Sequence, residues 1–420
     1  MRDKSKKASK SQLKRIRESL DDEISSDEEI QQEKKGYKDI SIEEDDFFET
    51  YDERKISMAK KYLKKLDIMD NEGSYDLSGL EDKIQKKELA NNLKLSTKTF
   101  YKGHKLSVTC ISVSDDSKIA YTGGKDCAMI RWDLETGNKT IYSGRRKQFD
   151  CGGHFEQIKS ICIQRDKNLI CTAGVDRVIR LWDSRSPNCI DKLHGHTDTI
   201  TGLVSEPNSD MNQIISVSYD KTLKLWSLDS RAHMNTYYGH TNHITSCDIA
   251  IRDRPLTGSE DYTSRLWKLS ADSHLIFHSE NSNNNKVNTP IDSVCCIDNS
   301  TFLTGTQDGS IQYWSQFKKK PLLSCSKIHN SIISIRNIKF SDLVFTGGHD
   351  GVIKAWKIQS NQIINLNANI EIDGFVNSMD VTDQVLVAAI GQEHRLGRWE
   401  TVKYAKNGIL VQSLEFCSAD

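Results

Sequence analysis

Seven tryptophans recur along this 420-residue chain at intervals of 50, 44, 41, 47, 42 and 43 residues. An acidic residue lies six positions before each one, and Ser, Thr or, before the last, Ala lies ten positions before. The tryptophans are Trp132, Trp182, Trp226, Trp267, Trp314, Trp356 and Trp399. A repeat of about 40–45 residues that ends in Trp is typical of one blade of a β-propeller. The spacing therefore predicts an all-β fold, a seven-bladed WD-repeat β-propeller.

Five of the seven repeats carry a full set of His, Ser or Thr, Asp and Trp. We expect the His ring to bond the hydroxyl and the Asp, and the hydroxyl to bond the Trp indole N–H, so that each buried polar group has a partner. A hydrolase triad uses similar residues, but a catalytic set is needed once and this one recurs, which favours a structural role. The sets are His104, Thr122, Asp126 and Trp132; His154, Thr172, Asp176 and Trp182; His196, Ser216, Asp220 and Trp226; His240, Thr257, Asp261 and Trp267; and His329, Thr346, Asp350 and Trp356.

The last blade must be closed, because an open sheet edge would be exposed. Two segments are able to supply its outer strand, residues 97–101 near the start of the repeats and residues 408–416 at the end. The sequence does not choose between them. In either case the two ends of the ring lie close together.

The region before the repeats divides by charge. Residues 1–17 hold eight Lys or Arg and one Asp, whereas residues 18–53 hold sixteen Asp or Glu and three Lys. Blocks of like charge stay solvated. Residues 53–69 place apolar side chains on one helical face and lysines on the other. We therefore expect a disordered charged tail over 1–52, a helical extension over 53–95 and the propeller over 96–417.

Several classes of protein are disfavoured by what the chain lacks. It has no run of 18 apolar residues, so we expect no membrane span, and its basic N-terminus is not followed by the apolar stretch of a secretory signal. The eleven cysteines include no C-x-x-C pair, which argues against a disulfide framework or a zinc site. No phosphate-binding loop or H-E-x-x-H motif is present. We expect no metal, no cofactor, no small-molecule substrate and no enzymatic activity.

The string GQEHRLGRWE (391–400), with GFVNSMD (374–380) before it and AKNG (405–408) after it, resembles the closing blade of a known family. That family is the U3 small nucleolar RNA-interacting WD-repeat proteins of the small-subunit processome. Residues 103–137 are similar to the family's opening repeat, and AKKYLKKL (59–66) is similar to its helical lead-in. The resemblance covers roughly residues 54–415.

The resemblance implies a non-enzymatic scaffold of the U3 snoRNP that acts in pre-rRNA processing and in 18S rRNA and 40S subunit biogenesis. It implies U3 small nucleolar RNA as a partner, bound at the box B/C stem beside a kink-turn-binding snoRNP protein, together with other small-subunit processome proteins. The implied location is the nucleus and nucleolus. The basic runs KSKK (4–7) and KRIR (14–17) fit a nuclear import signal.

Three groups of basic residues are candidates for RNA contact, because Lys and Arg supply the electrostatic part of RNA recognition. The first lies in the longest interval between tryptophans, the second lies in the last repeat, and the third lies on the helix before the repeats. Each group has an ordinary alternative, a solvated loop or helix face for the first and third, and pairing with Glu393 or Glu400 for the second. The candidates are Arg145, Arg146 and Lys147; Arg395 and Arg398; and Lys60, Lys61 and Lys64.

A second function remains open, because the same fold also serves protein recognition. The chain would then be a generic WD-repeat adaptor, a peptide reader or ubiquitin-ligase substrate receptor without RNA contact. GQEHRLGRWE and the basic loop 145–147 are expected only for an RNA-binding protein. A peptide reader would instead line the upper entrance of the central channel with aromatic and Arg side chains.

Overall fold

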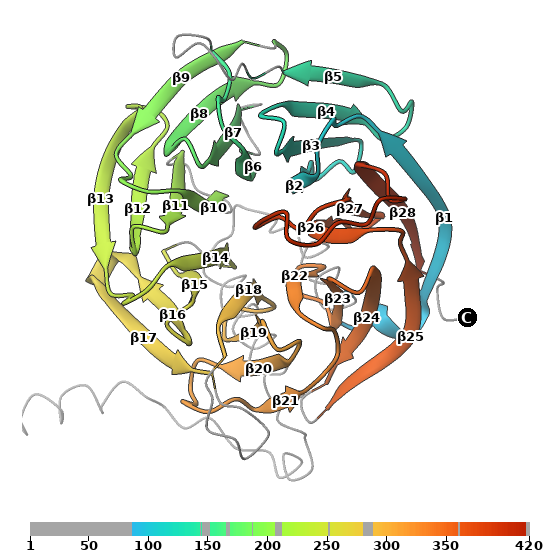
Figure 1. Ribbon diagram of the computed structural model, residues 1–420. Helices are drawn as coiled ribbons and strands as arrows, with labels where there is room; N and C mark the ends of the chain where they lie inside the picture. Colours follow the sequence, from blue (N-terminus) through green and yellow to red (C-terminus); the bar gives the residue numbers. More distant parts are fainter. Residues whose placement is uncertain are drawn as a thin grey trace, which may run out of the picture. The chain divides into compact units, whose positions relative to one another are not determined.

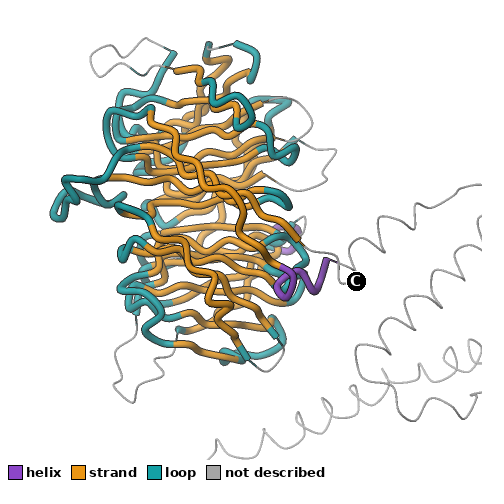
Figure 2. Tube along the Cα trace, turned by 90° about the vertical axis from the view of Figure 1, so that its right-hand side faces the viewer, coloured by secondary structure: helices purple, strands orange, loops and turns teal. Residues whose placement is uncertain are grey.

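The predicted propeller is confirmed by a computed structural model. The structure describes residues 86–142, 144, 152–164, 169–186, 188–205, 212–250, 253–279, 289–359 and 362–416. In this part of the chain seven four-stranded antiparallel sheets are arranged around a central channel (Figure 1). Seen from the side, the connecting loops gather on two faces with the strands between them (Figure 2).

Each blade runs from an inner strand at the channel to an outer strand at the rim. The first six blades use four consecutive strands, and the seventh combines strands from both ends of the chain. From the channel outward the strands are β2(Val108–Val113), β3(Ile119–Gly124), β4(Met129–Asp133) and β5(Lys139–Tyr142); β6(Ile158–Gln164), β7(Leu169–Gly174), β8(Val178–Asp183) and β9(Cys189–His194); β10(Ile200–Ser205), β11(Gln213–Ser218), β12(Thr222–Ser227) and β13(Ala232–Tyr238); β14(Ile244–Ile249), β15(Pro255–Ser259), β16(Thr263–Lys268) and β17(Ser273–His278); β18(Ile291–Cys296), β19(Thr301–Thr306), β20(Ile311–Ser315) and β21(Leu323–Cys325); β22(Ile332–Asn337), β23(Leu343–Gly348), β24(Val352–Ile358) and β25(Ile363–Glu371); and β26(Phe375–Val381), β27(Val385–Gly391), β28(Gly408–Phe416) and β1(Leu93–Lys102).

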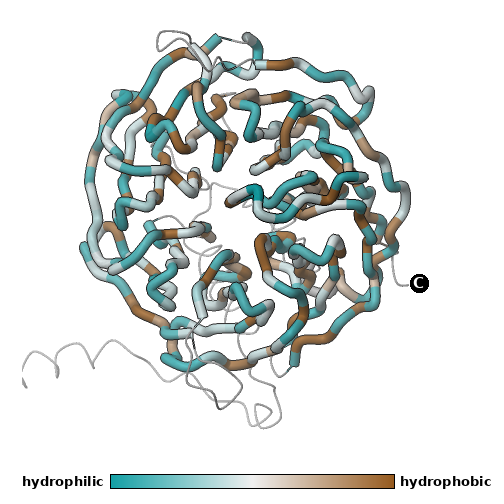
Figure 3. The backbone as a smooth tube through the Cα atoms, viewed as in Figure 1, coloured by the Kyte–Doolittle hydropathy of each residue, from teal (hydrophilic) through white to brown (hydrophobic). Residues whose placement is uncertain are grey.

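The core lies between neighbouring blades. In one cluster Cys171 and Ile179 of blade 2 pack with Ile214 and Trp226 of blade 3. Because each sheet is covered on both faces, the second strands are almost entirely buried, whereas the outer strand β13 is mostly exposed. Hydrophobic and hydrophilic positions are accordingly interspersed along the rim (Figure 3).

The ring is closed by both segments that the sequence offered. β28 is the third strand of blade 7, and β1 pairs with it as the outer strand, from Leu93 opposite Phe416 to Lys102 opposite Gly408. The first and last strands of the described chain therefore share one sheet.

The seventh repeat differs from the other six, because Trp399 does not lie in the third strand of its blade as their tryptophans do. Trp399 lies in the connection between β27 and β28, and 69% of its surface is exposed. In the other repeats the hydroxyl ten positions earlier accepts the indole N–H, but Ala389 at that position has no hydroxyl to offer. If Trp399 were buried in the blade as the other tryptophans are, its indole N–H would lack this hydrogen-bond acceptor.

The helical extension ends earlier than position 95. A 3-10 helix, η2(Lys86–Asn92), is followed directly by β1, which begins at Leu93 because pairing with β28 continues to that residue. η2 is fixed to the ring, since Ala90 is 3% exposed and its N–H donates to Asp342 Oδ1 at 3.2 Å. The tail 1–52 and residues 53–85 of the extension lie outside the described residues.

Two faces can be defined by the loops. The upper face carries the connections between the second and third strands of each blade, and the lower face carries the connections between the first and second strands. Side chains of inner strands bind the backbone of the next blade across the channel wall. Asp380 of β26 accepts the Val113 N–H at 2.7 Å, and Ser334 of β22 accepts the Met379 N–H at 3.1 Å. These bonds fix the inner strands of neighbouring blades relative to one another.

Candidate nucleic-acid interface

Each of the five His-containing sets forms a continuous hydrogen-bond chain inside its blade. In blade 3, His196 Nδ1 lies 2.7 Å from Asp220 and its Nε2 lies 2.6 Å from Ser216 Oγ, which accepts the Trp226 indole N–H at 2.8 Å. The carboxylate only accepts, so Nδ1 donates to it and Nε2 accepts the hydroxyl proton. The other four sets have the same connections.

These sets are buried too deeply to act on a substrate. Their five hydroxyl residues are completely buried, and each histidine is at most 7% exposed. Blade 5, which lacks the histidine, keeps only the bond from the Trp314 indole to Thr304 Oγ1 at 3.0 Å. The repeated hydroxyl, His and Asp groups thus stabilise strands and do not form a catalytic site.

Blade 7 departs most from the repeat. Its β27–β28 loop, residues 392–407, replaces the short turn that joins the same strands in other blades, such as 125–128 in blade 1. The loop is anchored to blade 1, where Lys125 Nζ contacts Glu393 Oε2 at 3.2 Å and donates to Gly397 O at 2.7 Å. Its two ends are tied together by Asn407 Oδ1, which accepts the Gln392 N–H at 2.9 Å.

Arg395 carries this loop over the upper end of the channel. Its Nη2 donates to the Asp292 carbonyl of blade 5 at 3.3 Å, and its own carbonyl accepts from Lys159 Nζ of blade 2 at 3.0 Å. Arg395 thereby connects blade 7 to blades 2 and 5, whose strands surround the channel in Figure 1. The upper entrance of the channel is covered by the chain's own arginine.

The outer side of the same loop is basic and aromatic. Arg398, Lys403 and Lys406 are exposed, and Trp399 and Tyr404 expose 69% and 78% of their surfaces. Arg398 forms one ion pair, with Glu393 at 3.3 Å, in which the Arg side chain remains 62% exposed. An ion pair this open contributes little stability and leaves the guanidinium accessible.

Comparison with known proteins shows which family the chain belongs to. The family profile of the WD domain, G-beta repeat, matches residues 95–133, 145–183, 187–227 and 232–268. A U3 snoRNP-associated protein-like YAOH of Oryza sativa subsp. japonica is 33% identical over 376 residues, which cover 80% of this chain and 71% of the relative. The U3 small nucleolar RNA-interacting protein 2 of Homo sapiens is 30% identical over 397 residues, covering 86% and 82%.

The chain belongs to the family of U3-associated WD-repeat proteins. A more distant relative, Ribosomal RNA-processing protein 9 of Saccharomyces cerevisiae, is 23% identical over 69% of this chain and 66% of its own length. The solved structure of U3-55K superposes with a TM-score of 0.70 at 28% identity, covering 75% of this chain and 98% of that chain.

Only part of the predicted site of this U3-associated WD-repeat protein falls in the described residues. Arg395 and Arg398 lie on one loop but point to different surroundings, the first to the channel and the second to solvent. The basic loop Arg145, Arg146 and Lys147 and the helix lysines Lys60, Lys61 and Lys64 lie outside the described residues. They stay predictions.

Several titratable groups are buried under the β27–β28 loop, and burial shifts their pKa values. Burial lowers the pKa of Lys159 to about 7, with Arg395 and Lys125 acting in the same direction. Burial also lowers the pKa of His394 to about 3, helped by His349, whose ring centroid is 3.9 Å away. Asp292 has its pKa raised to about 6 by burial, against the attraction of Arg395. Lys159 also lines a small cavity of about 80 Å³ in the channel, together with Arg395 and inner-strand residues such as Thr201.

Sequence reasoning did not find the aromatic half of this surface. Trp399 is counted with the seven repeat tryptophans, and Tyr404 is not part of the repeat. The interval between residues 391 and 408 was the available signal, because it is far longer than the turn at 125–128. A second strand that ends at Gly391 and a third that begins at Gly408 require an extended surface loop.

No metal or membrane feature competes with this interpretation in the part of the chain that the structure describes. Within those residues no group of three or more His, Cys, Asp or Glu side chains is placed to hold a metal ion. Among the same residues no helix has the length and apolar character needed to cross a membrane. The nine cysteines found there are free thiols.

Proposed function

We propose that this protein is a non-enzymatic scaffold of the U3 snoRNP and small-subunit processome that binds U3 small nucleolar RNA through its upper face. One observation carries the proposal, the anchored β27–β28 loop that presents three exposed cations beside two exposed aromatic rings. We base this role on the relatives, whose names refer to U3 association and to ribosomal RNA processing. We propose the nucleolus as its location and the pathway to 18S rRNA and the 40S subunit as its setting.

The chemistry of the loop suits structured RNA. Residues 392–407 hold four basic residues, Arg395, Arg398, Lys403 and Lys406, and two acidic ones, Glu393 and Glu400. Cations neutralise phosphates, and exposed aromatic rings stack on unpaired bases. A loop held by Lys125 and Asn407 loses little conformational freedom on binding, which favours affinity.

The partners belong to the same proposal. We propose that the loop meets the box B/C stem of U3 RNA beside a kink-turn-binding snoRNP protein, with other processome proteins on the remaining surfaces. We also propose Arg145, Arg146 and Lys147, and the lysines Lys60, Lys61 and Lys64, as further phosphate contacts. A generic peptide-reading adaptor is favoured less, because the Arg395 guanidinium at the upper channel entrance already donates to the Asp292 carbonyl of this chain.

The loop is tested by neutralising its exposed cations. The triple variant Arg398→Gln, Lys403→Gln, Lys406→Gln should weaken binding of a box B/C stem RNA about tenfold and reduce the salt slope by about 2. Fluorescence anisotropy at several salt concentrations measures both quantities. The matched control is Lys318→Gln, Lys319→Gln, Lys320→Gln, three exposed lysines in the β20–β21 connection. Equal affinity of the two triple variants would exclude the β27–β28 loop as the RNA contact.

The basic loop of the longest repeat is tested separately. Replacing Arg145, Arg146 and Lys147 with Ala should weaken the same RNA and flatten its salt dependence, by about one unit of slope for each phosphate that the loop no longer neutralises. Thermal stability should stay unchanged. Unaltered binding across the salt series would assign these residues to an ordinary solvated loop.

A further inference from the structure

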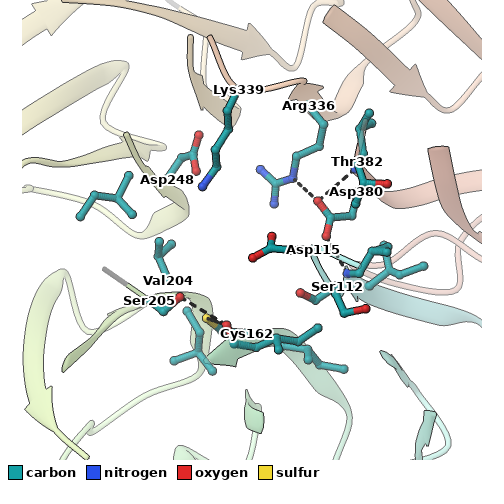
Figure 4. Close-up of a pocket in the computed structure, with 18 of the residues that line it drawn as sticks. Ser112, Asp115, Cys162, Val204, Ser205, Asp248, Arg336, Lys339, Asp380 and Thr382 are labelled. Atoms are coloured by element: carbon teal, nitrogen blue, oxygen red, sulfur yellow. Dashed lines mark hydrogen bonds and ion pairs between the residues drawn. The ribbon is translucent and has the colours of Figure 1, made fainter. Parts of the chain in front are cut away.

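Charged groups in the channel wall bind the chain's own backbone and one another. The lower end of the channel opens into a cavity of about 620 Å³. In its wall Arg336 Nε lies 3.9 Å from Asp380, which also accepts the Val113 N–H at 2.7 Å (Figure 4). Asp248 accepts the Cys296 N–H at 2.7 Å. These bonds join neighbouring blades, whereas the backbone donors and acceptors of a free sheet edge point outward, and the free edges of the blades lie at the rim.

The outer strands that form the rim differ in how their free edges are protected. Natural proteins protect such edges with charged side chains, with irregular pairing or by keeping the strand short. In the described part of the chain, six of the seven outer strands have at least one of these features. β1 carries three lysines, β9 carries an Asp and a Lys, β13 and β25 pair with an irregular register, and β5 and β21 are only four and three residues long.

β17, the outer strand of blade 4, has none of these features. Its six residues include no Asp, Glu, Lys or Arg, and all of them pair with β16 without an irregularity. Leu275 and Ile276 in its middle expose 51% and 40% of their surfaces. In Figure 1 the strand lies on the outside of the ring, between β13 and β21. A regular, uncharged and partly apolar edge is a template for pairing with another strand.

The pairing with β16 determines which backbone groups of β17 point outward. Just beyond the strand, Ser279 donates its N–H to the Tyr262 carbonyl at 2.9 Å. In an antiparallel pair, alternate residues of a strand bond to the same neighbour, so the odd-numbered residues of β17 bond to β16. The N–H and C=O groups of His274, Ile276 and His278 therefore point away from the sheet. Among the described residues none of these three makes a backbone hydrogen bond outside the sheet.

Both sides of this edge are apolar. Leu275 lies on the same face of the strand as Phe277, which is buried in the core between blades 4 and 5. Ile276 lies on the opposite face with His274, whose ring centroid is 4.8 Å from that of Trp267 in the core between blades 3 and 4. A strand added beside β17 would place its alternate side chains next to Leu275 on one side and next to Ile276 on the other.

The length and chemistry of the edge distinguish between possible occupants. A contact along six residues is far smaller than the about 20–30 residues a side of a stable interface, so a second copy of the ring is a poor fit. The strand has no Lys or Arg to neutralise phosphates, so RNA is also a poor fit. An extended peptide gains affinity from main-chain hydrogen bonds and specificity from alternate side chains, and this edge supplies partners for both.

We propose that the free edge of β17 is a docking site for an extended, uncharged segment of a protein partner, which adds to blade 4 as a fifth strand. His274, Ile276 and His278 supply three N–H donors and three carbonyl acceptors to its backbone. Leu275 and Ile276 select apolar side chains in it. The docking does not depend on the RNA contact, because β17 lies at the rim of blade 4 and the β27–β28 loop lies on the upper face of blade 7.

The probe is a fluorescein-labelled peptide, Gly-Thr-Val-Thr-Ile-Thr-Val-Gly, compared with the same peptide N-methylated at every interior amide, which cannot donate to the edge. The full-length protein without RNA should bind the first peptide and not the second, as measured by fluorescence anisotropy. The first peptide should also slow hydrogen exchange in β17 at the amides of His274, Ile276 and His278. The odd-numbered amides, which already bond to β16, should change little.

The protein variant that tests the edge is Ile276→Glu, which adds the kind of charge that protects other outer strands. It should weaken binding of the unmethylated peptide about tenfold. Arg265 lies opposite Ile276 in β16, so the new carboxylate faces a cation and the blade keeps its fold. The matched control is Ile190→Glu in β9, where the side chain is similarly exposed at 41% and the strand is already charged. The control should change binding less than about twofold.

Equal binding of the two peptides, equal losses in the two variants, or unchanged hydrogen exchange in β17 would overturn the proposal. Sedimentation equilibrium tests the competing occupant. A dimer of the unaltered protein that Ile276→Glu dissociates would overturn the proposal in favour of a second copy at this edge. Both variants should bind box B/C stem RNA as the unaltered protein does, so failure of the docking site and failure of the RNA contact are distinguishable.

Discussion

Trp226→Ala is expected to lower the free energy of unfolding by about 3–5 kcal/mol, the range for removing a buried aromatic side chain. Trp226 is 1% exposed and packs between blades 2 and 3 against Leu181 and Ile214. Its indole also donates to Ser216 Oγ, a completely buried atom that bonds His196. The loss therefore combines a cavity with a disrupted polar chain. Urea denaturation followed by tryptophan fluorescence and circular dichroism measures it.

Trp399→Ala is the matched control, because it changes the same residue type at the same position of the sequence repeat. Its side chain is 69% exposed, so the free energy of unfolding should change by less than about 0.5 kcal/mol. A loss comparable to that of Trp226→Ala would mean that Trp399 is part of a blade core and that the assignment of the β27–β28 loop is incorrect.

Acidification from pH 6.5 to 4.5 is expected to destabilise the propeller by about 1.4–2.7 kcal/mol per pH unit, equivalent to one or two protons taken up on unfolding. Burial lowers the pKa of His154, His240 and His394 in the folded state. These rings stay neutral in the native state while the unfolded chain protonates them below about 6.5. Their contribution is fully present above that pH and is lost as the pH falls.

Two groups oppose this trend. Burial raises the pKa of Asp292 to about 6 and raises that of Asp380, so the native state takes up protons there before the unfolded state does. Their stability contribution increases as the pH falls, so the net proton uptake on unfolding is smaller than the number of histidines whose pKa is lowered. The blade aspartates Asp220 and Asp261, whose pKa values are lowered, add destabilisation only below the ordinary carboxyl pKa of 3.8.

The pH effect is measured by urea denaturation at pH 7.5, 6.5, 5.5 and 4.5. His394→Asn should reduce the slope by up to about 1.4 kcal/mol per pH unit, because it removes one of the proton-binding groups. A stability that stays constant over this range would contradict the neutral state of the buried rings.

The sequence predicted all seven blades from the repeated Trp, and in six of them the Trp indole donates to the hydroxyl ten positions earlier. A Trp spaced 10 residues after a hydroxyl and 6 after an Asp has a partner for its indole, and the spacing cannot be met by chance six times. Blade 7 repeats the interval with Ala389 and Glu393, and the interval alone was misleading. The missing hydroxyl was the observation that distinguished the two cases.

The composition of the β27–β28 loop was visible in the sequence, but its geometry was not. Arg395 and Arg398 are three residues apart, and the sequence alone does not distinguish their roles. What distinguishes Arg395 is its contact with Asp292, 103 residues earlier, and with Lys159, 236 residues earlier. Such contacts depend on how the ring closes, which local periodicity does not encode. The lower cavity was not predicted, since no single repeat contains its walls.

The shared sheet of blade 7 also sets an order of events during synthesis. A ribosome releases β1 before any other strand, and β28, which β1 must pair with, is almost the last segment to emerge. Until then β27 presents an uncovered edge, the kind of surface that invites pairing with other chains. Loss of β28 would therefore leave β1 without its pairing strand and the ring open.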